Sequence, residues 1–203
     1  MRAFIGIALP DAVRSSLADL QRRLGESGAD VKWVEPEHLH VTLKFLDEIT
    51  EEQRRTVEEM LTHVAGQQRP FTLGLKQLGA FPSLRAPRII WVGLEEGREP
   101  VVRIAERIER EGQAIGLRRE ERPVAAHVTL GRVRSPKRRD SLAQRLQSAP
   151  WEPPEPFQVT ALTLYRSDLH SSGPRYTVLA EIPLTAAAGA AAKNPGRSAR
   201  PAS

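Results

Sequence analysis

The stretch His40-Val41-Thr42-Leu43 occurs a second time as His127-Val128-Thr129-Leu130. The two motif histidines are 87 residues apart, and the whole chain of 203 residues contains only five histidines. From average residue usage, the exact repeat of a chosen histidine-containing tetrapeptide arises by chance in about one chain per thousand of this size. The repeat therefore indicates either a duplicated unit or a pair of residues with a shared function.

Both copies are typical of strands, because β-branched residues alternate with other types over a short run. In a strand, alternate residues share a face, so His40 and Thr42 point one way while Val41 and Leu43 point the other. Duplication of a core explains why Val and Leu recur. It does not explain the recurrence of His and Thr on the polar face, where a single copy on its own would suggest only an edge strand. We therefore interpret the two histidines as a functional pair.

The surrounding sequence predicts a repeated unit of strand, helix, motif strand, helix and strand. Residues 88–94 are similar to residues 2–8, and this is where the order starts again. Hydrophobic periodicity and breakers predict strands near 2–9, 31–34, 38–45, 71–78, 88–94, 127–130, 157–165 and 175–183, and helices near 10–24, 50–66, 100–114 and 135–146. Thr50 followed by Gln53 predicts an N-cap for the second helix. The expected fold is α+β and bilobal, with two pseudo-symmetric antiparallel sheets and flanking helices around a central groove.

Composition places the chain among globular proteins, with 40% apolar and 27% charged residues. We expect one bilobal domain over residues 1–184 and a disordered, Ala-rich basic tail over residues 185–203. No apolar run approaches the ~20 residues that span a bilayer, so no membrane partner is expected. Cysteine is absent, which excludes disulfides, a thiolate nucleophile and a Cys-based zinc site and suits a reducing, cytoplasmic location. We expect a monomer.

The net charge is +5, and the densest basic region surrounds the second motif. Between residues 118 and 139, eight basic residues face two acidic ones; the basic residues are Arg118, Arg119, Arg122, Arg132, Arg134, Lys137, Arg138 and Arg139. This region is either a solvated surface or a site for a phosphate or a nucleic acid.

Two histidines facing one cleft suggest acid–base chemistry at phosphorus. Imidazole titrates near ~6.5, so one ring can be neutral and accept a proton while the other is charged and donates one. The hydroxyls of Thr42 and Thr129 are candidates to donate hydrogen bonds to phosphate oxygens. Arg132, five residues after His127, can bind two phosphate oxygens through its fork. This set requires neither a metal nor another cofactor.

The motif pair resembles the His-x-Thr-x signature of the 2H phosphoesterase superfamily. Residues 1–7, 43–46, 79–82, 88–93, 129–132 and 164–167 are further similar to the branch of RNA 2',3'-cyclic phosphodiesterases, also called 2'-5' RNA ligases. The resemblance covers about residues 1–184. Family members often carry Pro before the second histidine, where this chain has Ala126.

The resemblance implies a bilobal α+β fold and hydrolysis of RNA 2',3'-cyclic phosphate ends to 2'-phosphate ends. It implies His40 as the proton donor and His127 as the proton acceptor. Phe45, Tyr165 and Arg166 lie within these motifs and are candidate substrate-binding residues, together with Thr42, Thr129 and Arg132.

Two other functions remain open from the sequence. His38 and His40 share a strand face and could bind a metal ion with a third ligand such as His127 or Asp47. A non-catalytic RNA-binding module would use the basic region with aromatic stacking. The stacking candidates are Phe45, Phe81 and Tyr165, although such residues are more often part of a core. No Gly-rich phosphate loop is present, which argues against an ATP-driven kinase or ligase.

Overall fold

The computed structural model describes residues 1–120, 125–170 and 173–186. Its elements follow the predicted order, except that the predicted strands 71–78 and 157–165 are each divided in two. The helices are α1 at Asp11–Gly25, α2 at Glu51–Ala65, α3 at Arg98–Ala114 and α4 at Arg139–Ser148. The strands are β1 (Arg2–Ala8), β2 (Val31–Trp33), β3 (His40–Glu48), β4 (Phe71–Leu73), β5 (Leu75–Phe81), β6 (Ile89–Leu94), β7 (His127–Val133), β8 (Phe157–Val159), β9 (Ala161–His170) and β10 (Gly173–Pro183). A short 3-10 helix, η1 (Pro36–His38), precedes the first motif strand.

The strands form an eight-stranded antiparallel sheet and a separate two-stranded one, so the α+β class is confirmed. The main sheet has the order β10-β9-β1-β3-β7-β6-β5, with β2 paired to β7. It divides into two halves of four strands, which we call half I (β10, β9, β1, β3) and half II (β7, β6, β5, β2). One residue pair, Val41 opposite Val128, joins the halves between β3 and β7.

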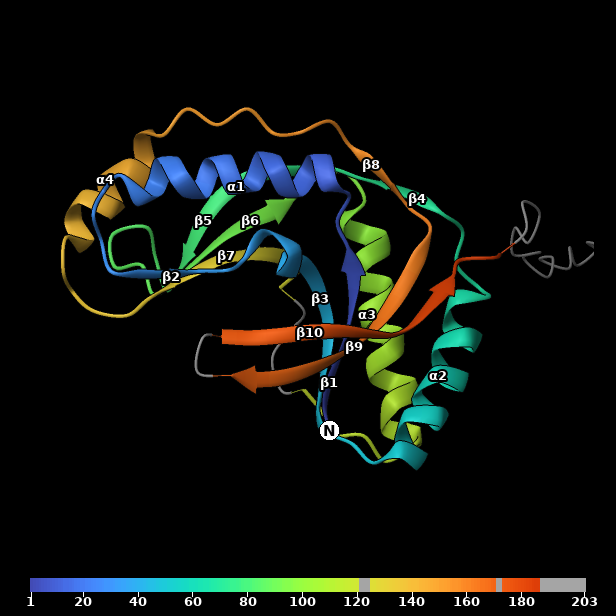
Figure 1. Ribbon diagram of the computed structural model, residues 1–203. Coiled ribbons are helices and arrows are strands. Elements are labelled where there is room, and N and C mark those ends of the chain that lie inside the picture. The colour runs from blue at the N-terminus through green and yellow to red at the C-terminus, as the bar shows by residue number, and fades with distance from the viewer. Residues whose placement is uncertain (121–124, 171–172, 187–203) are drawn as a thin grey trace, which may run out of the picture.

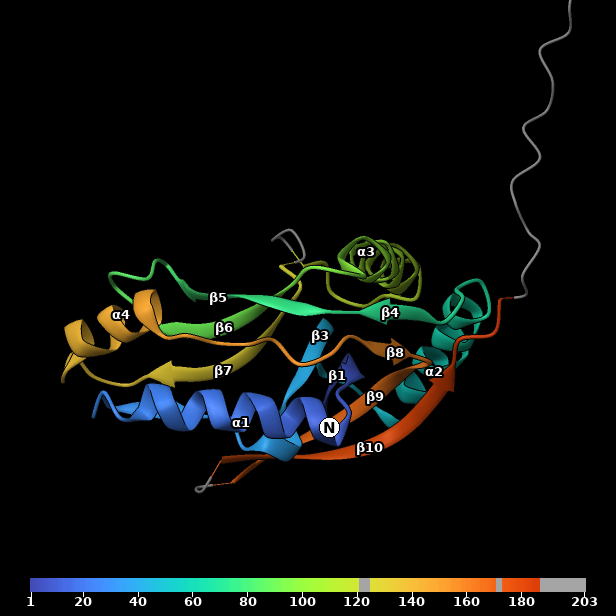
Figure 2. The same ribbon diagram turned by 90° about the horizontal axis from the view of Figure 1, so that it is seen from above.

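The two halves share an order of three strands, β3-β1-β9 in half I and β7-β6-β5 in half II, and they exchange strands between the sequence repeats. In half I, β1 and β3 come from the first repeat and β9 comes from the second. In half II, β6 and β7 come from the second repeat and β5 comes from the first. The small sheet pairs β4 of one repeat with β8 of the other. Figures 1 and 2 show α1 and α4 beside half II, and α2 and α3 beside half I.

One continuous apolar core lies between the sheet and the helices. The helices contribute one apolar stripe each, as in α1, where Val13, Leu17, Leu20 and Leu24 are buried at helical spacing. The motif strands contribute the face opposite their histidines, because Val41, Val128 and Leu130 have no exposed surface. The predicted alternation is thus confirmed: the apolar face packs inward, and the His/Thr face is left partly accessible.

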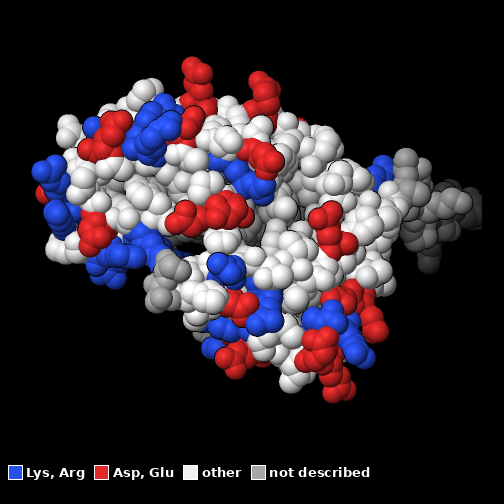
Figure 3. Space-filling model, in the orientation of Figure 1, with Lys and Arg blue, Asp and Glu red and all other residues white. Residues whose placement is uncertain are grey.

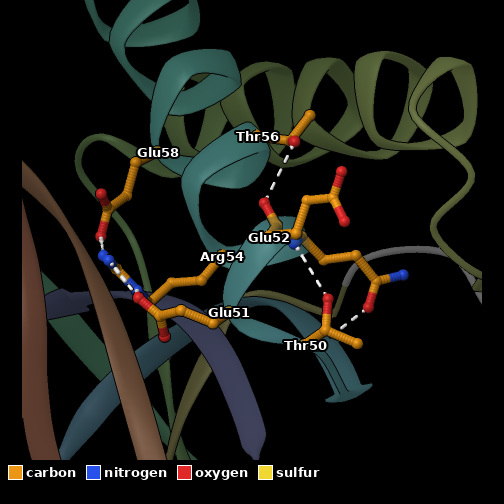
Figure 4. Close-up of polar contacts among 7 residues, drawn as sticks. Thr50, Glu51, Glu52, Arg54, Thr56 and Glu58 are labelled. Atoms are coloured by element: carbon orange, nitrogen blue, oxygen red, sulfur yellow. Dashed lines mark hydrogen bonds and ion pairs between the residues drawn. The ribbon is translucent and has the colours of Figure 1, made fainter.

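The predicted start of α2 is confirmed as a capping box (Figure 4). The Gln53 backbone amide donates to Thr50 Oγ1 at 3.1 Å, and the Thr50 amide donates to Gln53 Oε1 at 2.9 Å. These two bonds satisfy backbone donors that the first turn of a helix would otherwise leave unpaired. Arg54 adds ion pairs with Glu51 and Glu58 on the same helix.

No helix among the described residues is long and apolar enough to cross a membrane. Most of the predicted tail, residues 187–203, lies outside the described residues, as does Arg122 of the basic region.

Candidate active site

The β3–β7 pair brings the two motifs together. Val41 lies opposite Val128 in an antiparallel register. One step further in this register, His40 faces Thr129 and Thr42 faces His127, and residues that face each other across an antiparallel pair point to the same side. All four side chains therefore lie on one face of the sheet, at the point where half I meets half II.

Each histidine is held by the same two contacts. Nδ1 of His40 lies 2.7 Å from the carbonyl oxygen of His38, and its Nε2 lies 2.9 Å from Thr42 Oγ1. Nδ1 of His127 contacts the carbonyl oxygen of Ala125, and its Nε2 lies 3.2 Å from Thr129 Oγ1. The two threonines thus contact the histidines directly, a role that the sequence did not suggest.

The carbonyl contacts determine which ring nitrogen carries the proton. A carbonyl oxygen only accepts hydrogen bonds, so Nδ1 must be the N–H of each neutral ring. Nε2 of the neutral ring then holds a lone pair, to which the threonine hydroxyl donates. In the imidazolium form, Nε2 becomes a donor instead. Nε2 of each histidine is therefore the atom that can take up or release a proton.

Burial favours the neutral form of both rings. Burial is the main cause that lowers the pKa of His40 to about 4; the hydrogen bond to the His38 carbonyl opposes this shift, and the charges of His38 and His127 add to it. Burial also lowers the pKa of His127, and the positive charge of Arg132 adds to this effect. Without a ligand, both histidines are therefore poised as proton acceptors.

The two rings are surrounded by aromatic side chains from other strands. His40 lies 4.6 Å from Phe4, 5.9 Å from Tyr165 and 5.5 Å from Tyr176, measured between ring centroids. His127 lies 5.5 Å from Phe81 and 6.1 Å from Trp91. A ring face can stabilise a nearby cation, so these contacts suit an imidazolium as well as a neutral ring.

A β-bulge turns Arg132 onto the histidine face. Thr129 pairs with Trp91 and Gly131 pairs with Ile90, so Leu130 is an extra residue in β7. Leu130 and Gly131 are both buried, and the next residue, Arg132, is exposed. Strict alternation from His127 would have placed Arg132 on the opposite face, and the bulge reverses this.

Gln21 of α1 holds this bulge in place. Its buried amide donates to the carbonyl of Leu130 at 2.9 Å and to that of Val34 at 2.8 Å. The Val34 amide also donates to Leu130 at 2.8 Å. The carbonyl of the bulged residue thus receives two hydrogen bonds outside the regular ladder.

The same bulge occurs in β3 and determines the position of Phe45. Thr42 pairs with Gly6 and Lys44 pairs with Ile5, so Leu43 is the extra residue. Phe45 therefore occupies in half I the position that Arg132 occupies in half II. Phe45 is 59% exposed, so the interpretation of this residue as part of the core is wrong. Phe81 is 37% exposed. Both are available to a ligand on the histidine face.

Lys44 faces away from the histidines. Its ammonium group is buried and lies 2.5 Å from Glu109 of α3, and it donates to the Arg118 carbonyl at 2.9 Å. These contacts attach the segment that leads toward the second motif to β3. Lys44 is therefore a structural cation and is not available to a ligand.

Tyr165 and Arg166 lie on opposite faces of β9. Tyr165 pairs with Phe4 in the β1–β9 ladder and stacks on it at 4.8 Å, which places it beside His40. Arg166 pairs with Ala3, is exposed and contacts Asp168 at 2.9 Å. The structure thus brings Tyr165 to the site but not Arg166, which the sequence had also suggested.

The basic region does not form one patch. Arg118 lies near the end of β3, 3.8 Å from Asp47, whereas Arg138 contacts the Gly28 region beside α1. Basic side chains do gather at the edge near β2 and α4 (Figure 3). The described members of the region are thus distributed over both ends of β7, and the register places Arg132 on the histidine face.

The residues suggested as metal ligands are not gathered. His38 lies against Tyr176, with ring centroids 4.7 Å apart, and Asp47 pairs with Arg118. Within the described ranges, no three His, Asp or Glu side chains are grouped as a metal site.

Comparisons with known proteins agree with this geometry. A model of the LigT-like phosphoesterase family matches the chain twice, over residues 7–91 and 92–176. The chain belongs to this family. Each match contains one of the two motifs, and the predicted superfamily and its class of enzyme, a phosphoesterase, are confirmed.

Relatives of this LigT-like phosphoesterase carry a common name. An RNA 2',3'-cyclic phosphodiesterase of Methanothermobacter thermautotrophicus is 33% identical over 87% of this chain and 95% of its own length. One of Archaeoglobus fulgidus is 34% identical over 87% of this chain and 96% of its own length.

Solved structures show the same fold. A Thermus thermophilus protein superimposes with a TM-score of 0.76 at 28% identity, over 92% of this chain and 99% of that one. Escherichia coli LigT in complex with 3'-AMP gives a TM-score of 0.70 at 26% identity, over 91% of this chain and 98% of that one.

Proposed function

We propose that the protein hydrolyses the 2',3'-cyclic phosphodiester at the end of an RNA and leaves a 2'-phosphomonoester. The observation that carries this proposal is the matched pair of His–Thr contacts on one face of the sheet, with Nε2 of each ring available for proton transfer. The names of the relatives support the RNA substrate, and the nucleotide bound to E. coli LigT supports a site for a nucleoside phosphate.

In the proposed reaction, neutral His127 accepts a proton from water at Nε2. The water oxygen attacks phosphorus, and the bond between phosphorus and the 3'-oxygen breaks. Protonated His40 donates its Nε2 proton to the departing 3'-oxygen, which becomes a hydroxyl. The 2'-phosphate stays on the ribose, and the two histidines have exchanged protonation states.

The assignment of His127 as acceptor is supported by Arg132, whose positive charge disfavours a second cation on that ring. His40 must gain a proton to act as donor, although its pKa in the free protein is about 4. A bound phosphate supplies the opposite charge that raises this pKa. Proton donation by His40 is therefore coupled to substrate binding.

The other candidate residues surround the phosphate and its nucleoside. Thr42 and Thr129 can turn their hydroxyls from Nε2 to phosphate oxygens, and Arg132 can stabilise the charge that grows at phosphorus. Phe45 and Tyr165 are the candidates for contact with the terminal base. All these groups come from one chain, so a monomer is sufficient.

The test is product analysis on a short RNA that ends in a 2',3'-cyclic phosphate, with and without a chelator. We expect a 2'-phosphate product in both conditions. Complete loss of activity in chelator, restored by one divalent ion, would instead support a metal-dependent phosphoesterase. Tight RNA binding without any product would support the non-catalytic RNA-binding module.

A further inference from the structure

A second cation lies beside Arg132 on the histidine face. In the β2–β7 ladder, Lys32 lies directly opposite Arg132, between the pairs Val31–Val133 and Trp33–Gly131. Residues that face each other in such a ladder point to the same side of the sheet. Lys32 therefore shares the face that the bulge gives to Arg132.

The neighbours of Lys32 confirm this orientation. A Cβ atom added to Gly131 would lie 2.8 Å from both Trp33 and Val31, so these two side chains occupy the other face. A Cβ added to Gly25 of α1 would lie 3.6 Å from the Trp33 ring nitrogen, so that face packs against the helix. Lys32, between them in sequence, must point away from α1.

The Lys32 ammonium lies beside the β9–β10 hairpin of half I, and the charge of Arg132 acts on the same hairpin. The Lys32 ammonium lies 3.3 Å from the position that a Cβ on Gly173 would take. Burial raises the pKa of Tyr176, which lies three residues after Gly173 on β10, and the positive charge of Arg132 acts in the opposite direction. Figure 3 shows a hollow between β2 and this hairpin. Lys32 thus lies between β7 and the β9–β10 hairpin.

Two cations directly opposite each other attract an anion. Like charges directly opposite each other destabilise an antiparallel pair, and Arg132 has no ion pair with any residue in the described part of the chain. An anion between the two side chains would convert this repulsion into attraction, and phosphate suits both the guanidinium fork and the ammonium.

Arg132 and Lys32 lie so far along the strands from His127 that they can also contact a phosphate other than the reacting one. His127 pairs with Gly93 and Arg132 pairs with Ile89, which are four residues apart in β6. At ~3.4 Å per residue, the Cα atoms of His127 and Arg132 are separated by roughly 14 Å along the sheet. The charge of Arg132 still acts on His127, whereas the Lys32 ammonium lies beside Gly173.

We propose that Lys32, together with Arg132, forms a second phosphate subsite that binds the phosphodiester on the 5' side of the terminal nucleotide. This inference rests on the proposed function, because it assigns a neighbouring phosphate of the same RNA substrate. Its consequence is selectivity: an RNA end is a better substrate than a mononucleoside 2',3'-cyclic phosphate, which lacks that phosphodiester.

The experiment compares kcat/KM for three substrates. The first is a mononucleoside 2',3'-cyclic phosphate, and the second is a dinucleotide with the same cyclic end. The third is that dinucleotide with an uncharged methylphosphonate in place of its internal phosphodiester. We expect the charged dinucleotide to exceed the methylphosphonate by about 10-fold, the scale of one hydrogen bond to a charged group.

Lys32→Gln is expected to remove this difference and to leave the rate on the mononucleoside substrate unchanged. Lys76→Gln is the matched control, because Lys76 is an exposed lysine on β5 that pairs with Glu95; it should keep the 10-fold preference. Should Lys32→Gln fail to fold, Lys32→Met, which retains the aliphatic stem, is compared in the same way.

Three outcomes decide the matter. Equal rates on the charged and uncharged dinucleotides in the wild type would overturn the subsite while leaving the proposed function intact. A Lys32 variant that loses activity on all three substrates to the same degree would show that the lysine serves the reacting phosphate or the fold. Absence of hydrolysis of every substrate by the wild type would reject the proposed function itself.

Discussion

The pKa of His40 offers the sharpest test of the proposed proton transfer. Burial lowers this pKa to about 4 in the ligand-free protein. A proton donor that works near neutral pH must be substantially protonated in the complex. The perturbation that we consider is the binding of a 2'-phosphonucleoside, the product of the proposed reaction, which places a phosphate beside the ring.

The size of the effect follows from Coulomb's law. Two unit charges ~4 Å apart at an effective dielectric constant of ~20 interact by about 4 kcal/mol. One pKa unit corresponds to about 1.4 kcal/mol, so a bound phosphate raises the pKa of His40 by roughly 3 units. Added to the value of about 4 in the free protein, this gives a pKa near ~7 in the complex.

The assay is a titration of the histidine ring signals by NMR, with and without the 2'-phosphonucleoside. The chain has five histidines, and the His40 signal is identified by its loss in His40→Asn. We expect a midpoint near 4 without ligand and near ~7 with it. The pH profiles of activity should show the same shift. The pKa that limits kcat at high pH should be higher than the pKa that limits kcat/KM, because kcat reports the complex and kcat/KM reports the free protein.

Two results would refute the reasoning. A midpoint near the ordinary histidine value in the free protein would show that burial does not control this ring. A midpoint that stays near 4 with ligand bound would exclude His40 as the donor at neutral pH and would exchange the roles of His40 and His127.

Three further predictions concern the same groups. Replacing His40 or His127 with Ala should lower kcat by on the order of 10² to 10⁴, and the double variant should lose far less than the product of the two losses; a single variant with a near wild-type rate would remove that histidine from the mechanism. Arg132→Ala should lower kcat as well as weaken binding, because the arginine acts most strongly on the charged transition state, and Arg132→Lys should restore activity only in part; an unchanged kcat in Arg132→Ala would contradict this. The free energy of unfolding, measured in urea, should decrease as the pH is lowered from about 6.5 to about 4, by up to about 1.4 kcal/mol per pH unit. The reason is that the unfolded chain binds a proton at His40 that the folded chain excludes. His40→Asn should flatten this dependence, and an equal slope in the variant would assign the effect to other groups.

Much of the site could be predicted because it depends on local periodicity. The repeated tetrapeptide identified both motif strands, and the period of two separated His40 and Thr42 from the core-facing Val41. The sequence predicted that the two polar faces meet across a groove between two sheets. In the structure the motif strands are neighbours in one sheet, joined by the pair of Val41 with Val128, so that the polar side chains meet on one face.

The positions of Arg132 and Phe45 could not be derived in this way. Strict alternation would place both on the face opposite the histidines, and only a bulge in each strand reverses them. The bulge in β7 depends on Gln21, more than a hundred residues earlier in the chain. No local pattern around Arg132 contains that information.

The aromatic surroundings of the histidines were missed for a related reason. Phe4, Trp91 and Tyr176 lie on strands distant in sequence from the motif that each contacts. The match of residues 2–8 with 88–94 also aligns Ile7 with Gly93, whereas in the sheet Ile7 pairs with Val41 and Val92 pairs with Val128. Equivalent positions in the two halves therefore become visible only from the hydrogen-bonded register.

The exchange of strands between the repeats has a consequence for how this protein can be divided or could have arisen. A chain cut between β5 and β6 would yield fragments that each lack a neighbouring strand: the first would retain β1 and β3 without β9, and the second β6 and β7 without β5. Neither fragment holds a complete half of the sheet, and each would leave an unpaired strand edge. A single repeat could be stable only as an interlocked dimer, in which two identical chains each lend a strand to the other. Fusion of such a dimer into one polypeptide would leave its two histidines free to diverge into a donor and an acceptor.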